Sequence, residues 1–279
     1  MPHDHDLGLA HDLNTLHRQA ASRRRALRWL AGGSALALLG CGGGGDNAGT
    51  TTGGGTTGGG STGSCSVIPE ETAGPFPGDG SNSSGGAIAN ALALSGIVRS
   101  DIRSSIAGAT GVATGVPLTV VIDLVNTSGS CADLSGYAIY LWHCDAVGRY
   151  SMYSSGVTAE NDLRGVQPPA SDGTATFVTV FPGCYAGRVP HIHFEIYRST
   201  AAASAFSNKL RTSQLALPRD TCSTVYSGSS TYSASVANLN AISFATDGVF
   251  SDGVTTQLAT VTGDLAGGFT ALLTVGIAA

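Results

Sequence analysis

The chain has 279 residues, of which 42% are hydrophobic and only 12% charged, and its formal net charge is −5 at pH 7. Ordinary globular domains carry about 25% charged residues, so this composition, with its abundant Gly, Ser and Thr, favours a secreted β protein. The mild acidity and the lack of a basic patch argue against a nucleic-acid partner. No apolar run of about 18 residues is present, which argues against a transmembrane span.

Residues 1–40 have the features of an export signal. The stretch SRRRALRWL (22–30) resembles a twin-arginine signal, and the apolar stretch after it ends in LLGC (38–41), which resembles a bacterial lipoprotein cleavage box. We therefore expect cleavage before Cys41, a lipid on its sulfur, and anchoring on the bacterial cell envelope or its periplasmic face. The alternative is an uncleaved apolar anchor. Twin-arginine export carries folded proteins that often contain a cofactor, which is a first indication of a metal.

Residues 41–64 form the second segment, the lipidated cysteine followed by a Gly/Thr/Ser-rich tether. A coil of this kind spans roughly 25 Å root-mean-square and would hold a domain away from a membrane surface. Residues 65–279 then have a length that one domain commonly has.

Runs rich in β-branched and aromatic residues follow one another through residues 65–279, separated by Gly, Asn, Asp and Ser. The clearest predicted strands are 118–126, 136–145, 174–181, 191–197, 213–218, 257–263 and 269–278. Helical periodicity is weak, and only 236–245 is expected to form one or two helical turns. The pattern predicts an all-β fold, a two-sheet β-sandwich of prealbumin or immunoglobulin type with long active-site loops.

The predicted strand HIHFEIY (191–197) alternates apolar and polar residues. Side chains of a strand point alternately to its two faces, so Ile192, Phe194 and Ile196 face a core while His191 and His193 share the other face. Two histidines spaced in this way can contact one atom. The alternative is an ordinary solvated polar face of an amphipathic strand.

Two tyrosines belong to the same argument. Tyr150 and Tyr185 each lie just beyond a predicted strand, where loops on a rigid scaffold build sites. Structural zinc favours Cys and His, whereas phenolate is a hard anionic oxygen donor that suits ferric iron. Two phenols with two imidazoles therefore indicate an iron site.

Two other functions compete with this interpretation. The stretch that leads to Tyr185, a turn, a strand and a Pro-Gly turn, is also common in small prealbumin-like modules, so a non-catalytic cell-surface binding module is one alternative. The other is a cupin-like Fe(II) dioxygenase with a two-His-one-carboxylate site formed by His191, His193 and Glu195. Neither alternative explains the two tyrosines.

Five stretches together resemble the intradiol ring-cleavage dioxygenases, which include catechol 1,2-dioxygenase and protocatechuate 3,4-dioxygenase. That family carries a tryptophan strand ending in Gly-x-Tyr, a Pro-Gly turn with a second tyrosine, and Arg-x-x-His-x-His. The corresponding stretches here are LWHCDAVGRY (141–150), FPGCY (181–185) and RVPHIH (188–193), with ETAGPF (71–76) and RTSQL (211–215) similar to two further active-site segments. The resemblance covers roughly residues 65–220, and it is closest to secreted bacterial members.

The resemblance implies a non-haem Fe(III) enzyme of the EC 1.13.11 type. It would use dioxygen to cleave a catechol between its two hydroxyl-bearing carbons, giving a cis,cis-muconate-type diacid in aromatic compound catabolism. The resemblance implies that iron is held by Tyr150, Tyr185, His191 and His193, with Tyr185 as the labile ligand. Arg188 would stabilise negative charge on the substrate ring, and Gln214 would form hydrogen bonds in the pocket. The helical dimerisation region of the catechol 1,2-dioxygenases is missing, so their oligomeric state does not transfer.

The substrate walls are expected from the loop around Pro75 and Phe76, from residues 151–170 and from the C-terminal third. The sequence identifies no definite partner for a substrate carboxylate, although Arg164 lies in a plausible loop. We therefore expect neutral catechols or bulky phenolics rather than protocatechuate. Trp142 is expected in the core, and His143 is expected to be a polar strand-end residue rather than a ligand.

Five cysteines remain if Cys41 is lipidated, an odd number in an oxidising compartment. Cys144 and Cys184 lie beside the implied iron ligands, where a free thiolate would compete for the metal, and we expect them to form a disulfide. Cys65 is expected to pair with Cys222, which would leave Cys131 free.

Overall fold

The computed structural model describes residues 66–279, so the predicted signal, tether and Cys41 lipidation lie outside the described residues. The regular secondary structure of the described part is mostly β-strand, as predicted, and no helix in it is long and apolar enough to cross a membrane. The strands are β1 (Asp79–Ser84), β2 (Ala87–Asn90), β3 (Pro117–Asn126), β4 (Ala132–Asp133), β5 (Ala138–Trp142), β6 (Arg164–Gln167), β7 (Thr174–Val180), β8 (His191–Tyr197), β9 (Lys209–Ala216), β10 (Thr260–Asp264) and β11 (Gly268–Ile277). The helices are α2 (Arg219–Gly228) and α3 (Ser233–Ala241), with 3₁₀ turns η2 (Phe206–Asn208), η3 (Ser230–Tyr232), η4 (Phe244–Thr246) and η5 (Phe250–Asp252).

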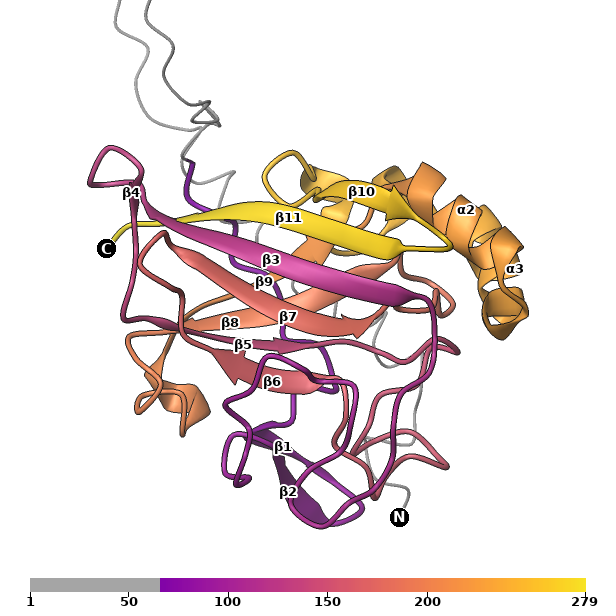
Figure 1. Ribbon diagram of the computed structural model, residues 1–279, viewed down its shortest axis with the longest axis horizontal. Coiled ribbons are helices and arrows are strands. Elements are labelled where there is room, and N and C mark those ends of the chain that lie inside the picture. The colour runs from indigo at the N-terminus through magenta and orange to yellow at the C-terminus, as the bar shows by residue number, and fades with distance from the viewer. Residues whose placement is uncertain (1–65) are drawn as a thin grey trace, which may run out of the picture.

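The strands form two larger sheets and one hairpin. The five-stranded sheet has the order β10-β11-β3-β4, with β7 also paired to β3, and the four-stranded sheet has the order β6-β5-β8-β9. The β11–β3 pair is parallel, and the pairs of the four-stranded sheet are all antiparallel. Figure 1 shows the β1–β2 hairpin at one side of these sheets, and the helices α2 and α3 together at the end beside β10.

The two larger sheets share one hydrophobic core. As predicted from the alternation in β8, Ile192, Phe194 and Ile196 are fully buried in it. The same core receives inward-facing side chains from the other sheet, such as Val120 of β3 and Val275 of β11. This shared core is consistent with the predicted sandwich arrangement, and its continuity holds β8 rigidly against the opposite sheet.

The second face of β8 is also buried, which differs from an ordinary solvated polar face. All seven residues of the strand are buried, including Glu195 and Tyr197. A second hydrophobic cluster covers this side and contains side chains from the segment that precedes β3, such as Ala91 and Ile97, and from β5, such as Trp142. The two histidines of β8 therefore lie between two apolar clusters, and neutral polar groups in such surroundings need specific partners.

The sequence reading missed α2, β1, β2 and β6, and it placed only part of α3. In α2, Cys222, Val225 and Tyr226 are buried at helical spacing, so a weak signal was present. The Tyr226 hydroxyl donates to the Pro182 carbonyl at 2.9 Å, a contact 44 residues away in sequence. This helical segment is therefore stabilised by tertiary contacts that local periodicity does not reveal.

Candidate metal centre

The centre begins with the two histidines of β8. Both side chains point to the same side of the strand, both are buried, and their Nε2 atoms are 3.1 Å apart. The Nδ1 of His191 lies 2.6 Å from the Val189 carbonyl oxygen. A carbonyl only accepts hydrogen bonds, which assigns the proton to Nδ1 and leaves the lone pair of His191 on Nε2, directed into the centre.

The ring of His193 is fixed by packing. Trp142 of β5 stacks on it in a nearly parallel arrangement, with ring centroids 4.9 Å apart and an interplanar angle of 6°. Trp142 is fully buried, as expected for a core residue. Gly74 also lies beside this ring: its φ is +68, and an added Cβ would lie 3.4 Å from Cε1 of His193. A glycine is needed there because side chains rarely adopt this backbone conformation.

The two tyrosines complete the centre. Tyr185, which is half-buried in the Pro-Gly turn, has its hydroxyl 3.2 Å from Nε2 of His191. Tyr150 is almost fully buried, and its ring lies 6.0 Å from that of Tyr185 and 6.2 Å from that of His193. Its hydroxyl makes no hydrogen bond of normal geometry, although a buried hydroxyl ordinarily does. All four side chains that the sequence singled out are therefore brought together.

Burial keeps these four groups uncharged. It lowers the pKa of His191 well below its ordinary value, with help from the Arg188 charge, and it lowers that of His193, with help from His191. Burial also raises the pKa of Tyr185 to about 12 and that of Tyr150 well above its usual range. Two neutral imidazoles and two neutral phenols thus face one point, and only a strong positive charge there would ionise the phenols near neutral pH.

The donor set fits a hard metal ion. Three polar atoms crowd around the single lone pair of His191 Nε2, at 3.1 Å from His193, 3.2 Å from Tyr185 and 3.4 Å from Arg188. One lone pair cannot satisfy all three as hydrogen bonds, whereas the His and Tyr donors could share one cation. No group of three or more His, Cys, Asp or Glu in residues 66–279 is placed to hold a metal. A metal here would therefore need phenolic oxygens, which suit a hard cation.

The two-His-one-carboxylate alternative is not supported, because the carboxylate of Glu195 is engaged elsewhere. Its Oε1 lies 3.1 Å from Nζ of Lys209, and its Oε2 accepts a hydrogen bond of 2.6 Å from the Tyr197 hydroxyl. His143 is also outside the donor set, as predicted: its ring nitrogens bond to the Cys144 carbonyl and to Thr179. Unlike the expected strand-end residue, His143 is completely buried.

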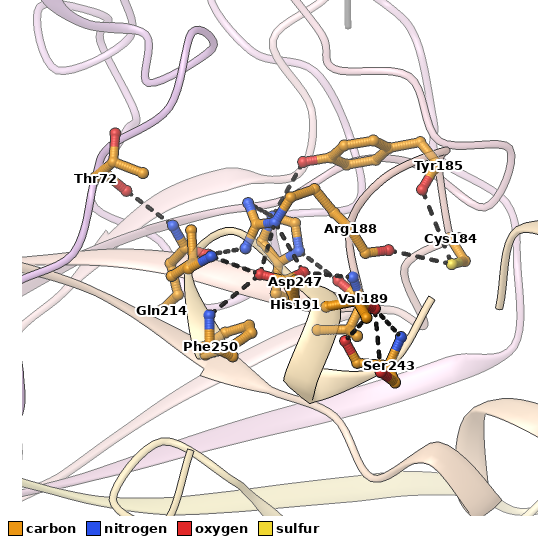
Figure 2. Close-up of polar contacts among 12 residues, drawn as sticks. Thr72, Cys184, Tyr185, Arg188, Val189, His191, Gln214, Ser243, Asp247 and Phe250 are labelled. Atoms are coloured by element: carbon orange, nitrogen blue, oxygen red, sulfur yellow. Dashed lines mark hydrogen bonds and ion pairs between the residues drawn. The ribbon is translucent and has the colours of Figure 1, made fainter. Parts of the chain in front are cut away.

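Arg188 and Gln214 form a network beside His191 (Figure 2). Arg188 Nη2 donates to Gln214 Oε1 at 2.7 Å, and Gln214 Nε2 donates to the Thr72 carbonyl at 2.9 Å. Burial alone would lower the pKa of Arg188, but Tyr185 and Asp247 outweigh it, and the pKa is raised. The guanidinium is therefore a permanent positive charge beside the four donors.

The sequence reading missed Asp247, which pairs with Arg188 through a 3.0 Å contact and is completely buried. It lies in the stretch FATDGVF (244–250), where an Asp-Gly pair predicts only a turn. Nothing in the local pattern distinguishes it from a solvated turn aspartate, because its partner lies 59 residues away.

Aromatic rings pack beside Tyr150. Phe76 packs against Tyr150 at 4.9 Å and against Tyr153 at 5.3 Å between ring centroids. Arg164, expected in a loop as a possible partner of a substrate carboxylate, instead belongs to β6 and is almost fully buried. All five of its N–H donors have partners: Pro77 O, Tyr140 Oη, Phe76 O, Ser151 O and Ser151 Oγ. Arg164 therefore holds the loop that contains Phe76 in place through hydrogen bonds, and it has no N–H left for a substrate carboxylate.

The expected disulfides are wrong. Cys144, Cys184 and Cys222 are buried free thiols, and Cys131, expected to be free, is disulfide-bonded. The Sγ atoms of Cys144 and Cys184 are turned toward different carbonyl oxygens, of Gly183 at 3.5 Å and of Arg188 at 3.4 Å. Each thiol thus has its own acceptor, and neither is directed at the other.

These thiols are expected to resist alkylation in the folded protein. Burial raises the pKa of Cys184 to about 12, and it also raises the pKa of Cys144 and Cys222, so the reactive thiolate is scarce at pH 8. Iodoacetamide followed by peptide mapping should leave all three unmodified in buffer and modify all three in guanidinium chloride. Rapid labelling of Cys184 in the folded protein, or its recovery in a disulfide, would contradict this expectation.

No protein-family model matches the sequence, and no curated protein sequence matches it. Solved structures do match. An intradiol ring-cleavage dioxygenase from Tetranychus urticae has a TM-score of 0.56 and 25% identity, over 76% of this chain and 95% of that chain. A second dioxygenase structure has a TM-score of 0.55 and 24% identity, over 76% and 94% of the two chains, and it shows a shared fold. These comparisons confirm the resemblance that the motifs predict: the chain is similar in structure to the intradiol ring-cleavage dioxygenases.

Proposed function

We propose that this chain is a non-haem Fe(III) dioxygenase, built on a two-sheet β-sandwich, that cleaves catechols between their hydroxyl-bearing carbons to give cis,cis-muconate-type diacids. Tyr150, Tyr185, His191 and His193 would hold the iron. The observation that carries the proposal is the convergence of these two phenols and two neutral imidazoles on one buried point, where the Tyr150 hydroxyl has no normal hydrogen bond. The structural likeness to an intradiol ring-cleavage dioxygenase supports it.

When bound, ferric iron would supply the Lewis acidity that favours a catecholate over a catechol and activates its ring toward dioxygen. Tyr185 is the half-buried member of the set, and burial raises its pKa to about 12. With iron bound, Tyr185 would be a phenolate; we expect its oxygen to take up a proton from the entering catechol and the resulting neutral phenol to turn toward solvent. Tyr150, buried under Phe76, would stay in place.

Arg188 acts on the charge of the substrate. Its Nη1 lies 3.4 Å from His191 Nε2, while its Nη2 donates to Gln214 and its Nε donates to Asp247. A fixed cation in a buried site stabilises negative charge that develops on the ring, without reorganisation of water. Gln214 holds the guanidinium in this place and ties it to the Thr72 loop.

We further propose that the substrate is an uncharged catechol or a bulky phenolic. Arg164, the candidate partner for a carboxylate, has all its donors bound within the protein. The rings of Phe76 and Tyr153 pack against each other beside Tyr150, so apolar surface lies next to the proposed metal ligands. A substrate carboxylate would lose its hydration there without gaining a partner, which is costly.

The proposal is tested by incubating the iron-loaded protein with catechol, protocatechuate, hydroxyquinol and a caffeate-type catechol under ¹⁸O₂. We expect muconate-type acids that carry label from dioxygen, and faster turnover of the substrates without a ring carboxylate. A yellow semialdehyde would indicate extradiol cleavage instead. Iron-loaded protein that turns over no catechol would favour the non-catalytic binding module, and a clear preference for protocatechuate would contradict only the substrate class.

Export and lipid attachment at Cys41 are proposed on the sequence motifs alone, since residues 1–65 lie outside the described part. Metabolic labelling with a radioactive fatty acid tests this, because Cys41→Ser should abolish incorporation. Unchanged labelling of that variant would show that the lipoprotein assignment is wrong.

A further inference from the structure

Asp247 occupies an unusual position for a turn residue, because every oxygen of its carboxylate is in use inside the protein. It lies between η4 and η5 and is completely buried. Its Oδ1 accepts the backbone N–H groups of Val249 at 2.8 Å and Phe250 at 3.2 Å, which fixes the carboxylate to its own loop. Oδ1 also accepts the Nε–H of Arg188 at 3.2 Å, and Oδ2 makes both of its contacts with Arg188 and Val189, beside the donor cluster (Figure 2).

The first contact of Oδ2 is with the guanidinium of Arg188. The Nε–H of Arg188 donates to it at 3.0 Å, and the carbon of the guanidinium lies 5.7 Å from the ring centroid of Phe250. With Gln214 on Nη2, the group is held from three sides, and Nη1 is left facing His191. A carboxylate on Nε therefore sets which N–H of Arg188 reaches the centre.

The second contact of Oδ2 leads to the imidazole of His191. Oδ2 also accepts the backbone N–H of Val189 at 2.8 Å. The carbonyl of the same Val189 accepts the Nδ1–H of His191 at 2.6 Å. Histidines that bind metals almost always have such a partner on the other ring nitrogen, and that partner fixes the tautomer and the ring orientation. Here the partner is a backbone carbonyl whose residue is itself anchored by Asp247.

We propose that Asp247 is a positioning residue of this centre, whose single buried carboxylate fixes both the Arg188 guanidinium and the His191 imidazole. The effect on catalysis rests on the proposed function, whereas the effect on His191 does not. The segment that follows β9 thereby contributes to the centre through one turn, although none of the four donors comes from it.

The test is Asp247→Asn in the full chain, compared with Thr246→Val. Thr246 belongs to the same loop and caps η4 with Ser243, but it does not touch Arg188 or His191. We expect Asp247→Asn to retain iron, to lose about 10- to 100-fold in kcat per bound iron, and to change KM by less than about threefold. Its visible phenolate-to-iron band should shift, while Thr246→Val keeps the wild-type band and kcat.

A readout without metal separates this inference from the proposed function. In ¹⁵N NMR of the metal-free protein, we expect the His191 Nδ1–H signal to be protected in the wild type and in Thr246→Val, and to be shifted or lost in Asp247→Asn. A folded Asp247→Asn protein with wild-type kcat, visible band and His191 signal overturns the proposal. Wild-type protein without iron or turnover refutes the proposed function, and the NMR comparison then still decides the role of Asp247.

If Asp247→Asn does not fold, Asp247→Glu decides the question. Glutamate keeps the negative charge beside Arg188, but its extra methylene prevents the carboxylate from holding both Arg188 and the Val189 amide in their present places. We expect a folded protein with a reduced kcat and a shifted band. A wild-type kcat together with a wild-type band in Asp247→Glu would overturn the positioning role.

Discussion

His193→Ala is expected to abolish metal retention and, with it, all turnover and the red-to-purple colour expected of phenolate-bound ferric iron. The Nε2 of His193 is one of only two imidazole nitrogens at the centre, 3.1 Å from the other. Loss of an outer partner of a metal ligand already costs about 10- to 100-fold in affinity, so loss of a ligand itself should exceed that. Iron per folded protein, measured after expression in iron-replete cells and desalting, checks the prediction.

A matched control is available in His143→Ala. His143 is likewise a buried neutral histidine, with its pKa lowered to about 4 by burial, and it bonds to the Cys144 carbonyl and Thr179 rather than to the donor set. Both variants leave a cavity, so both lose stability, but His143→Ala should keep its iron. Stoichiometric iron in folded His193→Ala, or a colourless wild type that holds zinc or copper, would contradict the ligand assignment.

Tyr185 is expected to be less critical for iron retention than His193 in the same assay. Tyr185→Phe should keep some iron with a shifted colour, because Tyr185 is half-buried and its hydroxyl already has a partner in His191.

How much of this centre could be predicted from sequence depends on how local its determinants are. The alternation in β8 is local, and it correctly placed His191 and His193 on one face and Ile192 and Phe194 in the core. The position of Tyr150 in the loop after β5 is local as well, although the strand ends earlier than predicted, at Trp142. Strand pairing then brings the histidines beside Trp142, since His193 is the register partner of Trp142 in β5.

The features that the sequence did not reveal are those decided by distant packing. Glu195 is completely buried, although the alternation in β8 places it on the polar face. Arg164 was expected in a loop, but it is buried because the distant carbonyl groups of Phe76 and Pro77 accept hydrogen bonds from its guanidinium. The expected pairing of Cys144 with Cys184 failed for a related reason. Closeness in sequence to neighbouring ligands says nothing about the direction of each Sγ, and a disulfide requires a specific geometry.

Arg188→Gln is expected to lower kcat per bound iron by about 10²- to 10³-fold, the usual cost of removing one fixed electrostatic stabiliser. It should also lower the free energy of unfolding by about 3–5 kcal/mol, because Asp247 remains as a buried carboxylate without its cation. Urea unfolding of the metal-free proteins measures the stability, and initial rates normalised to iron measure the turnover. Iron content should stay near the wild-type value, since Arg188 is not among the four donors.

The double variant Arg188→Gln/Asp247→Asn separates stability from catalysis. Removing the charge of Asp247 should recover part of the lost stability, because no unpaired carboxylate is left. The recovery is only partial because asparagine has one acceptor oxygen, whereas the two oxygens of Asp247 accept the backbone N–H groups of Val189 and Val249. Turnover should not recover. If Asp247 acts partly through Arg188, adding Asp247→Asn should lower kcat less in the Arg188→Gln protein than in the wild type, the non-additivity expected of contacting residues. Strict additivity of the two effects on kcat would show that Asp247 does not act through the guanidinium.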